Sequence, residues 1–286
     1  MGGNPLSREE MGMEFLFDLD DPLQCLEQIY QQLSPMVVAF QPQQPGAKPG
    51  RCFGSGLLLD YRGEKFIVTA EAVLAEACVA HGQQVLACVD KLQLPLQDLA
   101  CASPQHMDIA AIHLPQPWLE RHAPPHGFAL DHGGAPDPLA SAFTLLLGHP
   151  VRGPKPASQL NSHIGIVSRA YRGDSRRSQV IHPLFVEFDS RDILSRAKLD
   201  KAGLQEYYQL CGAPAISLYH SFQDDSNRLT AYLQGVVVEW DRDGIGATAS
   251  SAALLPGFLD NFLQQLRRGD AHGRAEVASL LEKYRR

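Results

Sequence analysis

The sequence predicts an all-β core with helices at both ends. Its 286 residues include 24 glycines and 20 prolines, and many short apolar runs lie between these turn-forming residues. Short apolar runs bounded by glycine and proline are typical of strands rather than of a helical bundle. A chain of this length can bury a full core, and all-β domains commonly exceed about 200 residues. One β domain with helical extensions is therefore sufficient.

The amino-terminal part is predicted to be a helix that ends at a proline. Apolar side chains recur with helical spacing over residues 21–33, and Asp20 or Asp21 is placed to cap the first turn. Pro35 ends the helix, because proline disfavours the helical backbone conformation in the residue before it. We therefore assign residues 1–35 to an amino-terminal helical extension.

Two strand-rich regions follow, separated by a proline-rich segment. The first covers residues 36–114 and includes a short helix expected near 71–81. The segment 115–138 combines several prolines with three histidines, so we expect it to hold no regular sheet and to cross the surface between the two regions. The second strand-rich region covers 139–250 and contains a polar insertion at 192–205.

The end of the chain is predicted to be helical. Leucine and phenylalanine recur at i, i+3 and i+4 spacing over 254–266, which is the apolar stripe of a helix that packs on a sheet. The sequence Arg267-Arg268-Gly269 suits its carboxyl end, because cations favour that end of the helix dipole and glycine can adopt the left-handed cap. A last helix is expected near 275–284. Residues 251–286 are therefore assigned to carboxyl-terminal helices.

Charge, hydropathy and cysteine usage exclude several classes of function. The net charge of −7 and a pI near 5.9 argue against a nucleic-acid binder, which needs a concentrated basic face. No stretch approaches the roughly 20 apolar residues that span a bilayer, and the amino terminus has no signal-peptide pattern. We expect a cytoplasmic protein without a nucleic-acid or membrane partner.

Metal and disulfide patterns are missing from the sequence as well. The six cysteines show no CxxC pairing, so we predict free thiols. No pair of histidines has the short spacing of a metal site, and neither a metal nor another cofactor is expected.

Several short motifs occur in an order that carries more information than any one of them. In chain order they are Gly54-Ser55-Gly56, Thr69-Ala70-Glu71-Ala72, Asp108-Ile109-Ala110, Gly148-His149-Pro150, Gln209-Leu210-Cys211-Gly212-Ala213-Pro214 and Gln234-Gly235-Val236-Val237-Val238. In content and order the set resembles the trypsin-like (chymotrypsin-fold) peptidases over most of the chain. The resemblance implies two six-stranded antiparallel β-barrels, one in residues 36–114 and one in 139–250.

The same resemblance implies a degenerate active site. Ala72 stands at the position of the catalytic histidine, Asp108 at that of the aspartate and Cys211 at that of the serine nucleophile. Gln209 and Cys211 take the oxyanion-hole positions, where Gln209 replaces a usual glycine. Val238 stands where the family has a serine that bonds the aspartate. Because the methyl group of Ala72 accepts no proton, the template mechanism lacks its base.

Two hypotheses about function follow from this pattern. The leading one is a catalytically inactive trypsin-fold protein, a pseudoprotease, that binds a protein or peptide partner in the former substrate cleft or through the terminal helices.

The alternative is a cysteine peptidase or other hydrolase, because a thiol is partly ionised near neutrality even without help. Its base would be displaced to His106, two residues before Asp108, or to His149, on a strand that could border the Cys211 loop. General-base work needs a heavy-atom contact of about 3 Å, and the sequence does not fix that distance.

Overall fold

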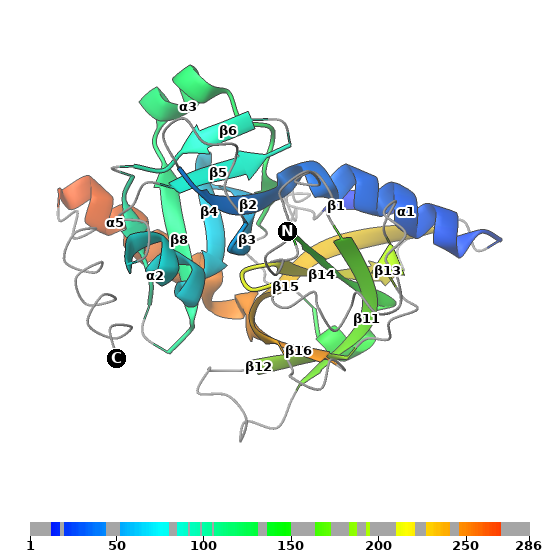
Figure 1. Cartoon of the computed structure of the whole chain (residues 1–286). Helices are drawn as coiled ribbons and strands as arrows, with labels where there is room; N and C mark the ends of the chain where they lie inside the picture. Colours follow the sequence, from blue (N-terminus) through cyan, green and yellow to red (C-terminus); the bar gives the residue numbers. More distant parts are fainter. Residues whose placement is uncertain are drawn as a thin grey trace, which may run out of the picture.

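The structure is a computed structural model of the whole chain, shown in Figure 1. It describes residues 13–17, 20–43, 52–79, 85–90, 92–97, 99–104, 106–130, 136–149, 164–172, 183–187, 193–194, 210–220, 227–240 and 246–269. The last helix predicted near 275–284 and most of the predicted insertion at 192–205 lie outside these residues.

The described residues form two mainly antiparallel sheets. The first sheet contains β2 (Val37–Pro42), β3 (Gly54–Tyr61), β4 (Glu64–Ala70), β5 (Val85–Val89), β6 (Leu92–Pro95), β7 (Cys101–Ala102), β8 (Ile109–Leu114) and β9 (Phe128–Ala129). The second sheet contains β1 (Met13–Leu16), β10 (Phe143–Gly148), β11 (Ile164–Arg172), β12 (Pro183–Glu187), β13 (Ile193–Leu194), β14 (Pro214–His220), β15 (Arg228–Trp240) and β16 (Gly246–Ser251).

The helices flank these sheets (Figure 1). They are α1 (Pro22–Leu33), α2 (Glu71–Val79), α3 (Gln116–His122) and α5 (Leu255–Arg268), with single 3-10 turns η2 (Ser34–Met36), η3 (Pro138–Ala140) and η5 (Ala252–Leu254).

The expected all-β class is confirmed, whereas the finer expectation of two six-stranded barrels stays a prediction. In the second sheet the order is β14-β10-β11-β12-β16, and β15 pairs with both β14 and β16, so six strands form a closed ring of pairings. In the first sheet the order β6-β5-β2-β3-β4-β8-β7 is an open path among the described strands. The boundaries 36–114, 115–138 and 139–250 also stay predictions.

The largest hydrophobic cluster lies between the two sheets and is covered by helices. Strand β3 contributes Leu57 and Leu59 to it, whereas Leu58 on the opposite face joins the interior cluster of the first sheet. Because both faces of β3 are buried, its sequence reads as a continuous apolar run instead of an alternating one. Helix α1 adds Ile29 and Leu33 to the same cluster, and α5 adds Leu259.

The predictions from helical spacing and capping are confirmed. Helix α1 begins after Asp21, whose side chain accepts a hydrogen bond from the Gln24 N–H at 3.2 Å. The helix expected near 71–81 is α2. Helix α5 ends at Gly269 in the left-handed conformation, with φ 72° and two arginines in its last turn. These features depend on local sequence, which explains why they are predictable.

The segment 115–138, expected to hold no regular sheet, contains a helix and one two-residue strand. Pro117 lies in the first turn of α3, where a missing N–H costs no hydrogen bond. Strand β9 then pairs in parallel with β3. Asp60 fixes it, because its carboxylate accepts the Gly127 N–H at 2.8 Å and its carbonyl accepts the Leu130 N–H at 3.0 Å.

The amino-terminal extension also contains a strand that the sequence did not predict. Strand β1 pairs with β15, with Glu14 bonded to Arg228 at 3.0 Å. Only four residues long, β1 has too short a pattern to identify without its partner. The extension 1–35 is therefore not wholly helical.

Three further observations concern the described part of the chain. No helix there is long and apolar enough to cross a membrane. All six cysteines lie within it, and none of them forms a disulfide. No group of three or more histidine, cysteine or acidic side chains in it is arranged to hold a metal ion.

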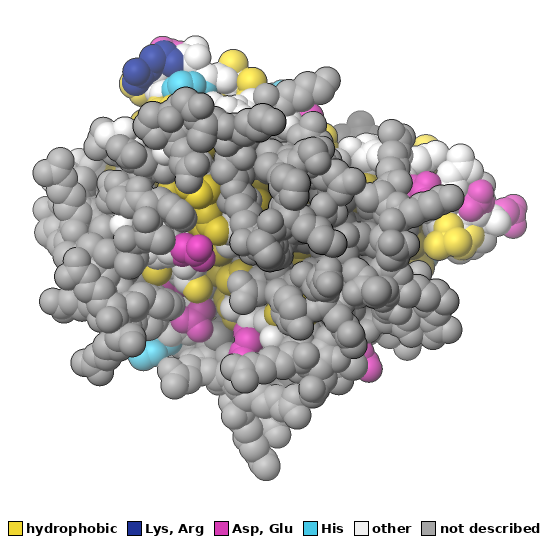
Figure 2. All heavy atoms as spheres, viewed as in Figure 1, with side chains coloured by type: hydrophobic (Ala, Val, Ile, Leu, Met, Phe, Trp, Pro, Cys, Tyr) yellow, Lys and Arg dark blue, Asp and Glu magenta, His cyan; other side chains and the backbone are white. Residues whose placement is uncertain are grey.

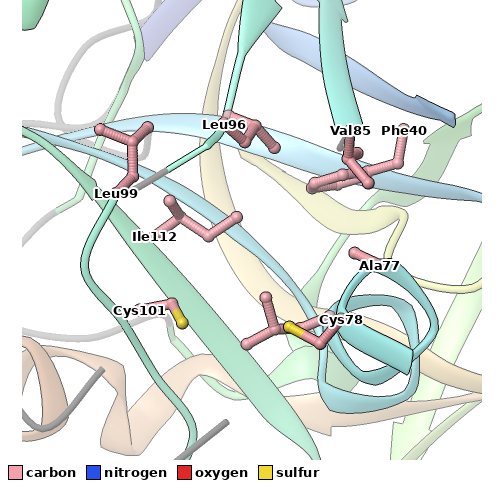
Figure 3. Close-up of a pocket in the computed structure, with 9 residues that line it drawn as sticks. Phe40, Ala77, Cys78, Val85, Leu96, Leu99, Cys101 and Ile112 are labelled. Carbon is pink, nitrogen blue, oxygen red and sulfur yellow. The ribbon is translucent and has the colours of Figure 1, made fainter. Parts of the chain in front are cut away.

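A small apolar cavity lies between α2 and the first sheet (Figure 3). Its volume is about 30 Å³, and it is lined by Phe40, Leu74, Ala77, Cys78, Val85, Leu96, Leu99, Cys101 and Ile112. A cavity without polar partners does not hold water well, so the lining atoms lose packing contacts.

We predict that Cys78→Val stabilises the protein, because it adds one methyl group next to the cavity without lowering helix propensity. One buried methyl group corresponds to about 0.8 kcal/mol in the free energy of unfolding. Chemical denaturation measures the difference, with Cys78→Ala, which enlarges the cavity, as the matched destabilised control. A decrease in stability for Cys78→Val would show that the cavity cannot accept the added group.

Candidate functional site

Cys211 lies in a tight turn that is hydrogen-bonded to both sheets. In this Cys211 turn, defined as residues 210–213, the Ala213 N–H donates to the Leu210 carbonyl at 2.8 Å. The Gly212 N–H donates to the Val237 carbonyl of β15 at 2.7 Å. From the first sheet, the Ser55 N–H donates to the Cys211 carbonyl at 2.8 Å. The turn is therefore held by backbone groups of both sheets.

Gly212 lets the Cys211 turn approach β3 more closely than a residue with a side chain would. Its φ is +84°, in the left-handed region that favours glycine. A Cβ atom there would lie 1.9 Å from the Ser55 carbonyl oxygen and 2.3 Å from Thr69 Oγ1. Thr69 Oγ1 itself donates to the Ser55 carbonyl at 2.6 Å. The glycine and the buried threonine thus bring the turn directly against β3.

His149, the residue directly after β10, lies beside the same turn. Ser55 Oγ accepts the His149 N–H at 2.9 Å and lies 3.3 Å from the His149 carbonyl, to which it donates. A Cβ atom at Gly148 would lie 2.9 Å from both Leu210 Cδ2 and Ala213 Cβ. The structure therefore brings the backbone of His149, a predicted displaced base, next to the turn. The His149 side chain is buried.

The environment of the Cys211 thiol favours its protonated form. Burial, together with the smaller effects of the nearby Glu76 and Asp108 carboxylates, raises the pKa of Cys211 to about 12, against a smaller opposite effect of the Gly212 N–H. The thiol donates to the Val238 carbonyl at 3.8 Å. Near neutral pH the thiolate, which is the nucleophilic form, is therefore scarce.

Ala72 and Asp108, which the resemblance assigns to the base and acid positions, lie on segments that meet at the start of α2. Ala72 is exposed in the first turn of this helix. The preceding Glu71 N–H donates to the Asp108 carbonyl at 2.8 Å, so the two segments are in direct contact. Asp108 is half-buried, and its φ of 52° is unusual for a residue with a side chain. His106, the other predicted displaced base, is exposed.

Two acidic residues of α2 that the sequence analysis did not select belong to this region. Glu71 is only 4% exposed and accepts a hydrogen bond from Ser103 Oγ at 2.9 Å. Glu76 is exposed, and its charge acts on Cys211. An acidic residue directly after the apolar strand β4 is the only signal in the sequence that could have indicated Glu71.

Val238 and Cys211 form the apolar part of the site. Both are half-buried and pack against the interior cluster of the first sheet. Val238 lies at an irregularity in β15, where the register with β16 shifts between Val237 and Glu239. Gln209 lies outside the described residues, so the oxyanion-hole position remains a prediction. Figure 2 shows acidic side chains beside exposed hydrophobic ones on the face that carries α2.

Comparison with known proteins gives structural similarity only. No protein-family model matches the chain, and no curated protein matches it either. Several similar solved structures are proteases. They include the inactive form of Rv3671c from M. tuberculosis H37Rv, at 13% identity and a TM-score of 0.46 over 86% of this chain and 96% of that one. A tobacco etch virus protease mutant has 12% identity and a TM-score of 0.44 over 81% of this chain and 80% of that one. Deg5 has 14% identity and a TM-score of 0.42 over 79% and 89%. At this level of identity and overlap, none of them assigns an activity to this chain.

We predict that Gly212→Ala strongly destabilises the protein, because the added methyl group would overlap the Ser55 carbonyl. The expected loss is about 3 kcal/mol or more. Gly63→Ala is the matched control: its φ is +78°, but nothing lies within 4 Å of the added atom. Backbone strain alone should cost the control about 1 kcal/mol. Equal losses in urea denaturation would show that the turn can move away from β3.

We predict that Cys211 reacts slowly with iodoacetamide at pH 8. With a pKa of about 12, only about one thiol in ten thousand is ionised at that pH. Because the pKa is raised, the rate should climb about tenfold per pH unit beyond pH 9, where an ordinary thiol levels off. Mass spectrometry of the Cys211 peptide measures the rate, and the same thiol in urea-unfolded protein is the control. A folded-state rate above the unfolded one would contradict the prediction.

Proposed function

We propose that this chain is a catalytically inactive trypsin-fold protein, a pseudoprotease, that binds a protein or peptide partner at the site around Cys211. The observation that carries the proposal is the charge environment of the thiol. Two carboxylates, those of Glu76 and Asp108, act on the thiol, and both raise the pKa of Cys211. Ala72, at the base position, offers no proton acceptor.

The alternative of a cysteine hydrolase needs the opposite arrangement. A catalytic thiol is activated by a neighbouring base or cation, which lowers its pKa. Here burial and two negative charges act together to keep the proton on sulfur. The exposed position of His106 gives no support to a displaced base. Acyl transfer would also require a developing negative charge next to these carboxylates, which is unfavourable.

The composition of the surface around Cys211 supports a role in binding. Cys211 and Val238 are partly exposed apolar groups, with the charged Glu76 exposed nearby. An apolar centre with a polar rim is the usual composition of a protein–protein interface. The hydrogen bonds that hold the Cys211 turn fix this surface in one conformation, which lowers the entropy lost on binding.

The helical extensions are a second candidate surface. Leu23 on α1 is 67% exposed, and Leu254, just before α5, is 45% exposed. Isolated exposed leucines are common on protein surfaces, so this region ranks below the Cys211 site. In both cases we propose a cytoplasmic protein partner, with no membrane, nucleic acid or cofactor involved.

The test is to incubate the purified protein with a proteome-derived peptide library and to analyse bound and unbound peptides by mass spectrometry. We expect selective retention without cleavage. Val238→Asp should weaken retention at least about tenfold, because it places a charge in the apolar centre. The matched control Leu23→Asp should leave retention unchanged if the Cys211 site is the binding surface. Hydrolysis that disappears in Cys211→Ala would overturn the proposal.

A further inference from the structure

We propose that Ser55 is the positioning residue of this site, because its hydrogen bonds hold both the Cys211 turn and His149 in a common frame. The inference deepens the proposed function and rests on it for its biological meaning. The hydrogen bonds that support it do not depend on whether a peptide binds.

Every polar group of Ser55 takes part in this junction. Its N–H donates to the Cys211 carbonyl at 2.8 Å, and its carbonyl accepts from Thr69 Oγ1 at 2.6 Å. Its hydroxyl oxygen accepts the His149 N–H at 2.9 Å and donates its proton to the His149 carbonyl at 3.3 Å. A hydroxyl group can fill both roles at once because it carries one proton and two lone pairs. The side chain is fully buried.

The hydroxyl bridges segments that are distant in the sequence. Ser55 and His149 are separated by 94 residues and lie at the ends of strands in different sheets. Gly148 packs directly on Leu210 and Ala213 of the Cys211 turn. A change at the Ser55 hydroxyl is therefore transmitted to the turn both through the Ser55 peptide group and through Gly148.

Removing the hydroxyl should loosen the turn selectively. In Ser55→Ala the N–H and the carbonyl of His149 lose this partner in a buried place, and a buried polar group without a partner favours local opening. Opening exposes Cys211 to water and relieves the burial that keeps its thiol protonated. The alkylation rate of the Cys211 thiol therefore reports whether the Ser55 hydrogen bonds hold the turn in place.

The experiment compares alkylation of Cys211 with that of Cys88, a half-buried cysteine of β5 in the same protein. Ser55→Ala should raise the Cys211 rate relative to the Cys88 rate by at least about tenfold at pH 8, because two buried hydrogen bonds of the hydroxyl are lost. Thr144→Val is the matched control. It removes another fully buried hydroxyl, bonded to Ser217 Oγ at 2.8 Å within the second sheet, and should leave the ratio unchanged.

A second variant decides the matter if Ser55→Ala does not fold. Thr69→Val is nearly isosteric and removes only the bond to the Ser55 carbonyl, so a smaller rise in the same ratio is expected. An unchanged ratio in the folded variants, or an equal rise in Thr144→Val, would overturn the role of Ser55. If wild-type protein retains no peptide while Ser55→Ala still raises the Cys211 alkylation rate, the result would count against the proposed function only.

Discussion

The close approach of the Cys211 turn to β3 is the constraint on which the site depends. Gly212 has no room for a side chain because the Ser55 carbonyl and Thr69 Oγ1 occupy that space. Each sheet completes most of its hydrogen bonds within itself, so the two could meet at many distances if only apolar side chains lay between them. The backbone contact at Gly212 removes that freedom and places Cys211 and Val238 at the junction.

The same closeness determines the chemistry of the thiol. A turn packed against a buried strand limits the contact of the Cys211 thiol with water, and desolvation disfavours the thiolate. In an active thiol enzyme a neighbouring cation offsets this effect, whereas here Asp108 and Glu76 add to it. Burial and the two carboxylates therefore both oppose nucleophilic attack by the Cys211 thiol.

The sequence predicted what local patterns determine. Helices α1 and α5 followed from spacing and from their caps, and the order of short motifs placed Ala72, Asp108 and Cys211 near one another. The sequence did not predict strands β1 and β9, because partners far along the chain stabilise them. The roles of Ser55 and Glu76 were missed for the same reason, since a hydroxyl or carboxylate shows its partner only in three dimensions.

The proposed loss of catalysis is compatible with this fold, because the residues that fix the Cys211 turn differ from those that the resemblance assigns to catalysis. Ala72 is exposed, so the group at the base position contributes little to the core. Gly212, Ser55 and Thr69 fix the turn, yet none of them stands at a position of the catalytic triad. On the proposed function, a substitution at position 72 would therefore abolish proton transfer without disturbing the junction, and the site would stay ordered for the binding of a partner.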